Sequence, residues 1–160
     1  MANFRAVDKV GMQHVLDFIV DKLEPYDTNK IEWLKLLPLN KKTLLHGECR
    51  FPVKYSQNTY KKSMGYRIRA SVNVEMTPPF SFMHWGRSYS DNGNRKWVSK
   101  EIKFYFLDLE ECAVHTLAHE CFHYLSHSGQ VDEKNYEANA NWWADRWLED
   151  FKVKALKILV

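Results

Sequence analysis

Hydrophobic residues near the start of the chain recur on one face of a helical projection. The apolar positions between residues 8 and 23 are Val10, Val15, Phe18, Ile19 and Leu23. Pro25 follows them, so this segment predicts an amphipathic helix. Segment 29–37, which stops at Pro38, predicts a second and shorter helix.

After Gly47 the hydrophobic period changes to that of a β-strand. From Tyr66 to Val74 every second residue is apolar and the residues between them are polar or small, which predicts a strand with one buried and one wet face. Segments 80–85 and 97–107 are expected to continue the same sheet. The polar run within residues 88–95 predicts the turn of a hairpin between them.

A helix is predicted after the strands. Asp108 or Glu110 can begin it, because acidic residues favour the positive end of a helix, and Ser128 and Gly129 end it. One arc of this helix is apolar and is expected to face the core. It holds Val114, Leu117, Ala118, Cys121, Phe122 and Leu125.

The last predicted helix spans residues 133–154, which contain no glycine or proline. On a helical projection Glu137 lies within about 80° of the apolar residues, so its carboxylate is expected on the buried face. These apolar residues are Ala140, Ala144, Trp147, Leu148, Phe151 and Ala155. The order of elements predicts an α+β fold, with N-terminal helices, an antiparallel-rich sheet and two C-terminal helices.

Composition limits the organisation of the chain. Its 160 residues are 45% hydrophobic and 14% aromatic, enough for one packed domain over residues 1–160 and few for two. No apolar run of about 18 residues and no apolar leader occurs, so we expect a soluble chain without a membrane partner. Cys49, Cys112 and Cys121 are odd in number and lack C-x-x-C spacing, which favours reduced thiols and a cytoplasmic location.

Charge is distributed unevenly along the chain. Residues 1–72 contain 13 Lys and Arg against 7 Asp and Glu, whereas residues 73–160 contain 10 against 13. A basic first half can contact nucleic acid, but it is more often a solvated face, so a nucleic-acid partner is the less favoured interpretation. The candidate cations are Lys41, Lys42, Lys54, Lys61, Lys62, Arg67 and Arg69.

The strongest chemical signal is the run from His119 to His123, which has the H-E-x-x-H pattern of zinc peptidases. On a helix the two histidines lie about 40° apart on one face, and Glu120 lies about 60° beyond His123. Two nitrogen ligands and one carboxylate base therefore share a side. Such a site needs a third protein ligand to hold zinc and leave one position open.

Glu137 is the first candidate for that third ligand. A carboxylate on an apolar helix face costs several kcal/mol unless it is paired or bound to a metal, and the small Ala140 and Ala144 allow a close approach to the neighbouring helix. A salt bridge to a buried arginine is the alternative interpretation. His127, one turn after His123, is the competing ligand, and His115 is a weaker one.

These residues resemble the metallopeptidases of the ImmA/IrrE type. The resemblance covers about residues 112–148 and rests on the H-E-x-x-H run followed by Glu137, Ala140, Asn141 and Ala144, with Trp143 where that family usually has Phe. It implies a small zincin-like fold, zinc bound by His119, His123 and Glu137, and Glu120 as the catalytic base. SprT-like metallopeptidases are a second relative of similar size, but their third ligand is a later histidine, and this chain has none after His127.

The expected function is hydrolysis of peptide bonds in a protein substrate. Zinc would activate a water, Glu120 would take its proton, and a donor among Tyr136, Tyr124, His115 and His127 would stabilise the oxyanion. Strand 100–107, just before the motif helix, is expected to pair with the extended substrate. The alternatives are a non-catalytic module that zinc stabilises and a DNA-associated protease of SprT type.

Overall fold

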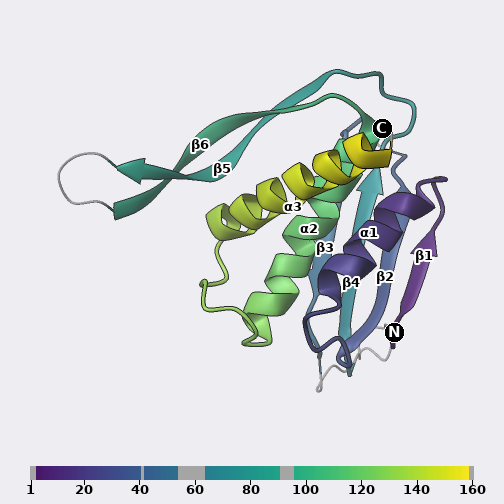
Figure 1. Cartoon of the computed structure of the whole chain (residues 1–160), viewed down its shortest axis with the longest axis vertical. Coiled ribbons are helices and arrows are strands. Elements are labelled where there is room, and N and C mark those ends of the chain that lie inside the picture. The colour runs from purple at the N-terminus through teal and green to yellow at the C-terminus, as the bar shows by residue number, and fades with distance from the viewer. Residues whose placement is uncertain (1–2, 41, 54–63, 91–95, 159–160) are drawn as a thin grey trace.

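The computed structural model describes residues 3–40, 42–53, 64–90 and 96–158. In this part of the chain it is a small α+β protein with three helices, a mixed four-stranded sheet and a separate two-stranded sheet (Figure 1). The elements are β1 (Arg5–Asp8), α1 (Gln13–Leu23), β2 (Ile31–Pro38), β3 (Leu45–Arg50), β4 (Tyr66–Val72), β5 (Phe80–Ser90), β6 (Lys96–Phe106), α2 (Leu109–His127) and α3 (Glu137–Ile158).

The four-stranded sheet has the order β1-β2-β4-β3. β1, β2 and β4 are parallel to one another, whereas β3 runs antiparallel to β4 at the edge. The prediction of an antiparallel-rich sheet is therefore wrong for this layer. The helix α1 connects β1 to β2, as a parallel pair requires.

Residues 80–106 form a long antiparallel hairpin of β5 and β6. The predicted hairpin is confirmed, while its turn at residues 91–95 lies outside the described residues. The prediction that these strands continue the main sheet is wrong, because they pair only with each other in the described part. In Figure 1 the hairpin passes over α3 and extends away from the main sheet.

The second predicted helix, at residues 29–37, is wrong, because β2 occupies this segment. The run from Ile31 to Leu37 is rich in leucine, which favours a helix locally. In the sheet, however, Leu34 and Leu36 both point inward and are fully buried between β1 and β4, so tertiary packing overrides the local preference. The four-residue strand β1 was not predicted at all.

The core lies between the inner face of the main sheet and the helices α1 and α2. The predicted buried face of β4 is confirmed at Tyr66, Ile68, Ala70 and Val72. The alternation fails at Ser71, which is also buried, and at Val74, which is exposed beyond the strand. No helix in the described ranges is long and apolar enough to cross a membrane.

Both predicted ends of the motif helix are confirmed. The Asp108 carboxylate accepts a hydrogen bond of 2.8 Å from the backbone N–H of Glu111, which satisfies a free donor in the first turn. At the other end Gly129 follows the helix with φ +74°, a left-handed conformation that glycine adopts without strain.

The last helix begins four residues later than predicted, at Glu137. Its apolar stripe is buried at Ala140, Ala144, Trp147 and Leu148. The Glu137 side chain, however, is 64% exposed. The prediction of a buried carboxylate is therefore wrong: Glu137 is exposed at the first position of α3, although Ala138 and Ala140 in the same turn are buried.

Candidate metal centre

His119 and His123 lie one turn apart on an arc of α2 that is not fully packed. Their side chains are 15% and 14% exposed, and the two Nε2 atoms are 3.1 Å apart. The opposite arc of α2 is buried against the sheet and α3. Core packing thus fixes the helix while its two imidazoles turn toward solvent.

Glu137 reaches both imidazoles from the start of α3. Its Oε2 lies 3.1 Å from Nε2 of His119, and its Oε1 lies 3.3 Å from Nε2 of His123. Together the three residues form a group that could hold a metal ion. Two ligand atoms each about 2.1 Å from a tetrahedral zinc are about 3.4 Å apart, so the three side chains fit zinc with little rearrangement.

Two asparagines orient the histidines. Nδ1 of His119 is 2.7 Å from Oδ1 of the buried Asn141, and Nδ1 of His123 is 2.6 Å from Oδ1 of Asn135. Because an amide oxygen only accepts, each Nδ1 carries a proton, which leaves Nε2 as the nitrogen that can bind a metal once it gives up its own proton.

The sequence reasoning assigned no role to either asparagine. Asn141 follows Glu137 by one helical turn and belongs to the motif that resembles the ImmA/IrrE type, so the sequence did contain a signal for it. Asn135 lies in the loop before α3 and gives no such signal.

The Glu120 side chain points toward the sheet, at β3. Only 8% of this residue is exposed, and burial raises the pKa of its carboxyl, an effect that the neighbouring imidazoles partly oppose. An ideal Cβ built on Gly47 would lie 2.2 Å from Oε1 of Glu120. Gly47 thus leaves the space that this carboxylate occupies. A glycine inside a strand signals such a close approach, but the sequence reasoning did not use it.

The ligand set is electrostatically coupled even without an ion. Hydrogen bonds with His119 and His123 lower the pKa of the Glu137 carboxyl. Burial disfavours the charged form of His123, but its bonds with Glu137 and Asn135 outweigh burial and raise the pKa of the imidazole. The site therefore favours an anionic Glu137 carboxylate beside a His123 imidazole that holds its proton more tightly. A metal ion would compete with protons for these atoms.

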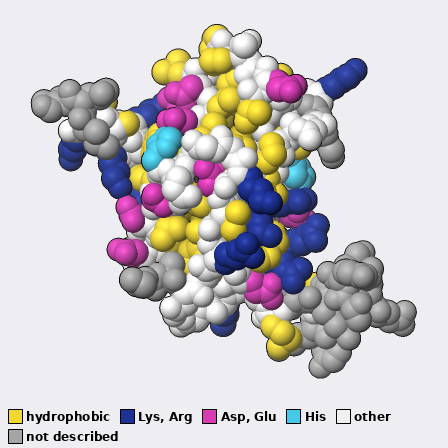
Figure 2. All heavy atoms as spheres, turned by 90° about the vertical axis from the view of Figure 1, so that its right-hand side faces the viewer, with side chains coloured by type: hydrophobic (Ala, Val, Ile, Leu, Met, Phe, Trp, Pro, Cys, Tyr) yellow, Lys and Arg dark blue, Asp and Glu magenta, His cyan; other side chains and the backbone are white. Residues whose placement is uncertain are grey.

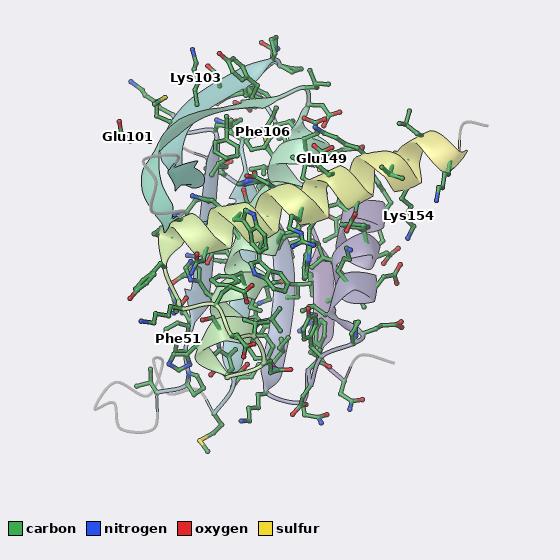
Figure 3. The ribbon with its side chains drawn as sticks, turned by 60° about the vertical axis from the view of Figure 1, so that its left-hand side comes forward. Phe51, Glu101, Lys103, Phe106, Glu149 and Lys154 are labelled. Atoms are coloured by element: carbon green, nitrogen blue, oxygen red, sulfur yellow. The ribbon has the colours of Figure 1, made fainter. Side chains whose placement is uncertain are left out.

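The competing histidines lie in other contacts. Nδ1 of His127 is 2.6 Å from the Tyr66 hydroxyl, and its ring stacks on Phe51 at 3.9 Å, at the end of β3 (Figure 3). His115 is 3% exposed, and its Nε2 is 2.9 Å from the Asp145 carboxylate. Glu137, and neither of these residues, completes the group around His119 and His123.

The four candidate oxyanion donors also separate in space. Tyr124 is buried, and its hydroxyl donates to the backbone carbonyl of Asp27. Tyr136 is 60% exposed and directly precedes Glu137. Of the four, Tyr136 combines exposure with a place in the chain next to a ligand.

Neither models of protein families, nor curated proteins, nor solved structures give a match to this chain. Inference about function rests on the geometry of the site.

Proposed function

We propose that this protein is a zinc-dependent metallopeptidase that hydrolyses peptide bonds of a protein substrate. One observation carries the proposal: three ligand atoms converge at distances that fit one ion, while Glu120 stays outside this ligand set but interacts electrostatically with all three of its members. This separation into three ligands and one nearby base is what metal-assisted hydrolysis requires.

A zinc ion at this site would supply a water acidified to a pKa of about 7 and would polarise a carbonyl. Glu120 takes the proton of the attacking water and returns it to the leaving amine. Its burial supports this role, because a raised carboxyl pKa lies closer to neutral pH, where both transfers are favourable. Asn141 and Asn135 hold the imidazoles in the tautomer that keeps both Nε2 atoms available.

The position of β3 supports substrate binding along its outer edge. Among the described residues β3 is one of the two edge strands of the main sheet, and its Gly47 lies against Glu120. An extended peptide that pairs with β3 would pass the base. Segment 100–107 stays the second candidate for the substrate strand, because β6 pairs with β5 along one edge and is, like β3, an edge strand among the described residues.

The test combines metal analysis with peptide cleavage. Glu120→Gln should retain about one zinc per chain and lose cleavage of a mixed peptide library, followed by mass spectrometry. Glu137→Ala should lose zinc affinity, and His127→Ala is the matched control that should keep it. Cleavage by Glu120→Gln at the wild-type rate would refute the mechanism.

A non-catalytic role is the second candidate, because the same three ligands join the start of α3 to α2. In that case zinc removal would unfold the chain, and the wild-type protein would cleave no peptide in the library.

A further inference from the structure

The outer face of the main sheet carries a regular array of cations. The strand registers align Arg5, Trp33, Arg67 and Arg50 in one row across all four strands. The next row contains Val7, Lys35, Arg69 and Glu48. Because neighbouring residues in register share a face, these side chains lie opposite the buried Leu34, Leu36 and Ile68.

Cations outnumber carboxylates on this face. Five cations meet two carboxylates: Glu32 binds Arg67 at 2.7 Å, and Glu48 binds Arg69 at 2.6 Å and also Arg50. Three positive charges remain in excess. Seen from the side of β1, the Lys and Arg side chains form a band on the surface (Figure 2).

An aromatic side chain lies inside the array. Trp33 occupies the second strand of the first row, between Arg5 and Arg67, and is partly exposed. The Lys35 ammonium lies 4.1 Å from the centre of its ring. Cations beside a partly exposed aromatic ring suit a chain of phosphates that carries stacking bases, and a base that stacks on Trp33 would take the place of the Lys35 ammonium.

We propose that the outer face of the β1-β2-β4-β3 sheet binds single-stranded nucleic acid. Phosphates would contact Arg5, Lys35 and the arginines of β4, and a base would stack on Trp33. A single strand is favoured over a duplex because the bases of a duplex are already stacked and cannot reach a ring on a flat sheet.

Only some of the basic residues named from the sequence as nucleic-acid contacts belong to this face. Arg67 and Arg69 belong to the face, and Lys42 is exposed in the segment before β3. Lys41, Lys54, Lys61 and Lys62 lie outside the described residues.

Nucleic-acid binding at the outer face does not depend on the proposed peptidase site. The helices that carry the metal ligands pack on the other side of the sheet. A variant of the outer face therefore tests nucleic-acid binding without touching a ligand, and loss of zinc leaves the cationic rows in place.

The experiment measures fluorescence anisotropy of labelled oligothymidylate and oligouridylate of about 15 nucleotides with the full chain, at salt concentrations from about 50 to about 200 mM. Arg5→Gln with Lys35→Gln removes two cations and leaves the arginine–glutamate pairs intact. Lys103→Gln with Lys157→Gln is the matched control, since it removes the same charge from the hairpin and α3. Trp33→Leu tests stacking, and thermal melting of each variant verifies folding.

Wild-type binding should weaken with salt, with a log–log slope of about −3 if four phosphates are contacted, and the Arg5 and Lys35 variant should reduce this slope by about 1.4. Trp33→Leu should weaken binding roughly five- to a hundredfold at an unchanged slope. Equal binding of both oligomers supports recognition by phosphates and stacking, which DNA and RNA share.

Three results would overturn the proposal. One is the absence of binding at low salt. Another is an equal loss in the control variant, which would assign binding to net charge alone. The third is binding of a duplex or of anionic phosphatidylserine vesicles that is as tight as that of single strands and insensitive to Trp33→Leu, which would describe a general polyanion surface.

Discussion

Gly47→Ala is the substitution that most directly probes the site. The added Cβ would lie 2.2 Å from Oε1 of Glu120 and 2.9 Å from its Cδ and Cγ, closer than side chains approach in real proteins. The carboxylate must withdraw by about 1 Å, and a displacement of that size at a catalytic group costs about a hundredfold in rate. None of the three atoms nearest to the added Cβ belongs to a metal ligand, so zinc content should stay unchanged.

Stability provides a readout that does not depend on activity. Overpacking at a buried position costs about 1–3 kcal/mol, measured as the free energy of unfolding in urea. In a Glu120→Ala background the clash has no partner, so the cost of Gly47→Ala should fall close to zero. His46→Ala, on the outer face of the same strand, is the control and should change little.

The cycle has a clear refuting result. If Gly47→Ala costs the same free energy with and without the Glu120 side chain, the contact between them is not what requires glycine. If the single variant also cleaves peptides at the wild-type rate, β3 does not position the base.

Three further predictions concern the surroundings of the site. Asn141→Ala should weaken zinc binding about 10- to 100-fold, measured by competition with a chelator, because it removes the acceptor that orients His119; unchanged affinity would contradict this role. In the zinc-free protein, burial raises the folded-state pKa of Glu120 above 4.5, so the folded state binds this proton more tightly and stability falls as pH rises from 4.5 through the folded-state pKa. Glu120→Gln should remove that fall and should be more stable than the wild type at pH 7 in urea titrations. Equal stability of the wild type at pH 4.5 and pH 7 would show that the buried charge of Glu120 is not costly. Burial raises the pKa of all three thiols, that of Cys112 to about 12, so none should react with a disulfide reagent at pH 8 until the chain unfolds, and rapid labelling of the folded protein would contradict this.

Local signals predicted the helices that carry the motif. The acidic cap at Asp108, the glycine after Ser128 and the apolar arc of α2 each depend on residues close in sequence, and all three are found in the structure. The pairing of His119 with His123 is likewise local, because one helical turn fixes it. Glu137 was predicted as the third ligand because its carboxylate was expected to be buried. The carboxylate is exposed, yet it lies beside both histidines.

Contacts between distant segments could not be predicted in this way. Segment 31–38 became a strand because β1 and β4 pair with it on both sides, and no local pattern of leucines reveals such neighbours. The approach of Gly47 to Glu120 and the alignment of Arg5, Trp33, Arg67 and Arg50 depend equally on strand register.

The sequence by itself determined which residues can bind a metal and which helix presents them, because helical spacing is set by the backbone within a few residues. Only the tertiary structure decided which carboxylate meets the histidines, which strand borders Glu120 and which face of the sheet gathers the cations. Those outcomes depend on how buried surfaces pack across long separations in the chain, where the free energy belongs to the assembled core and not to any one segment.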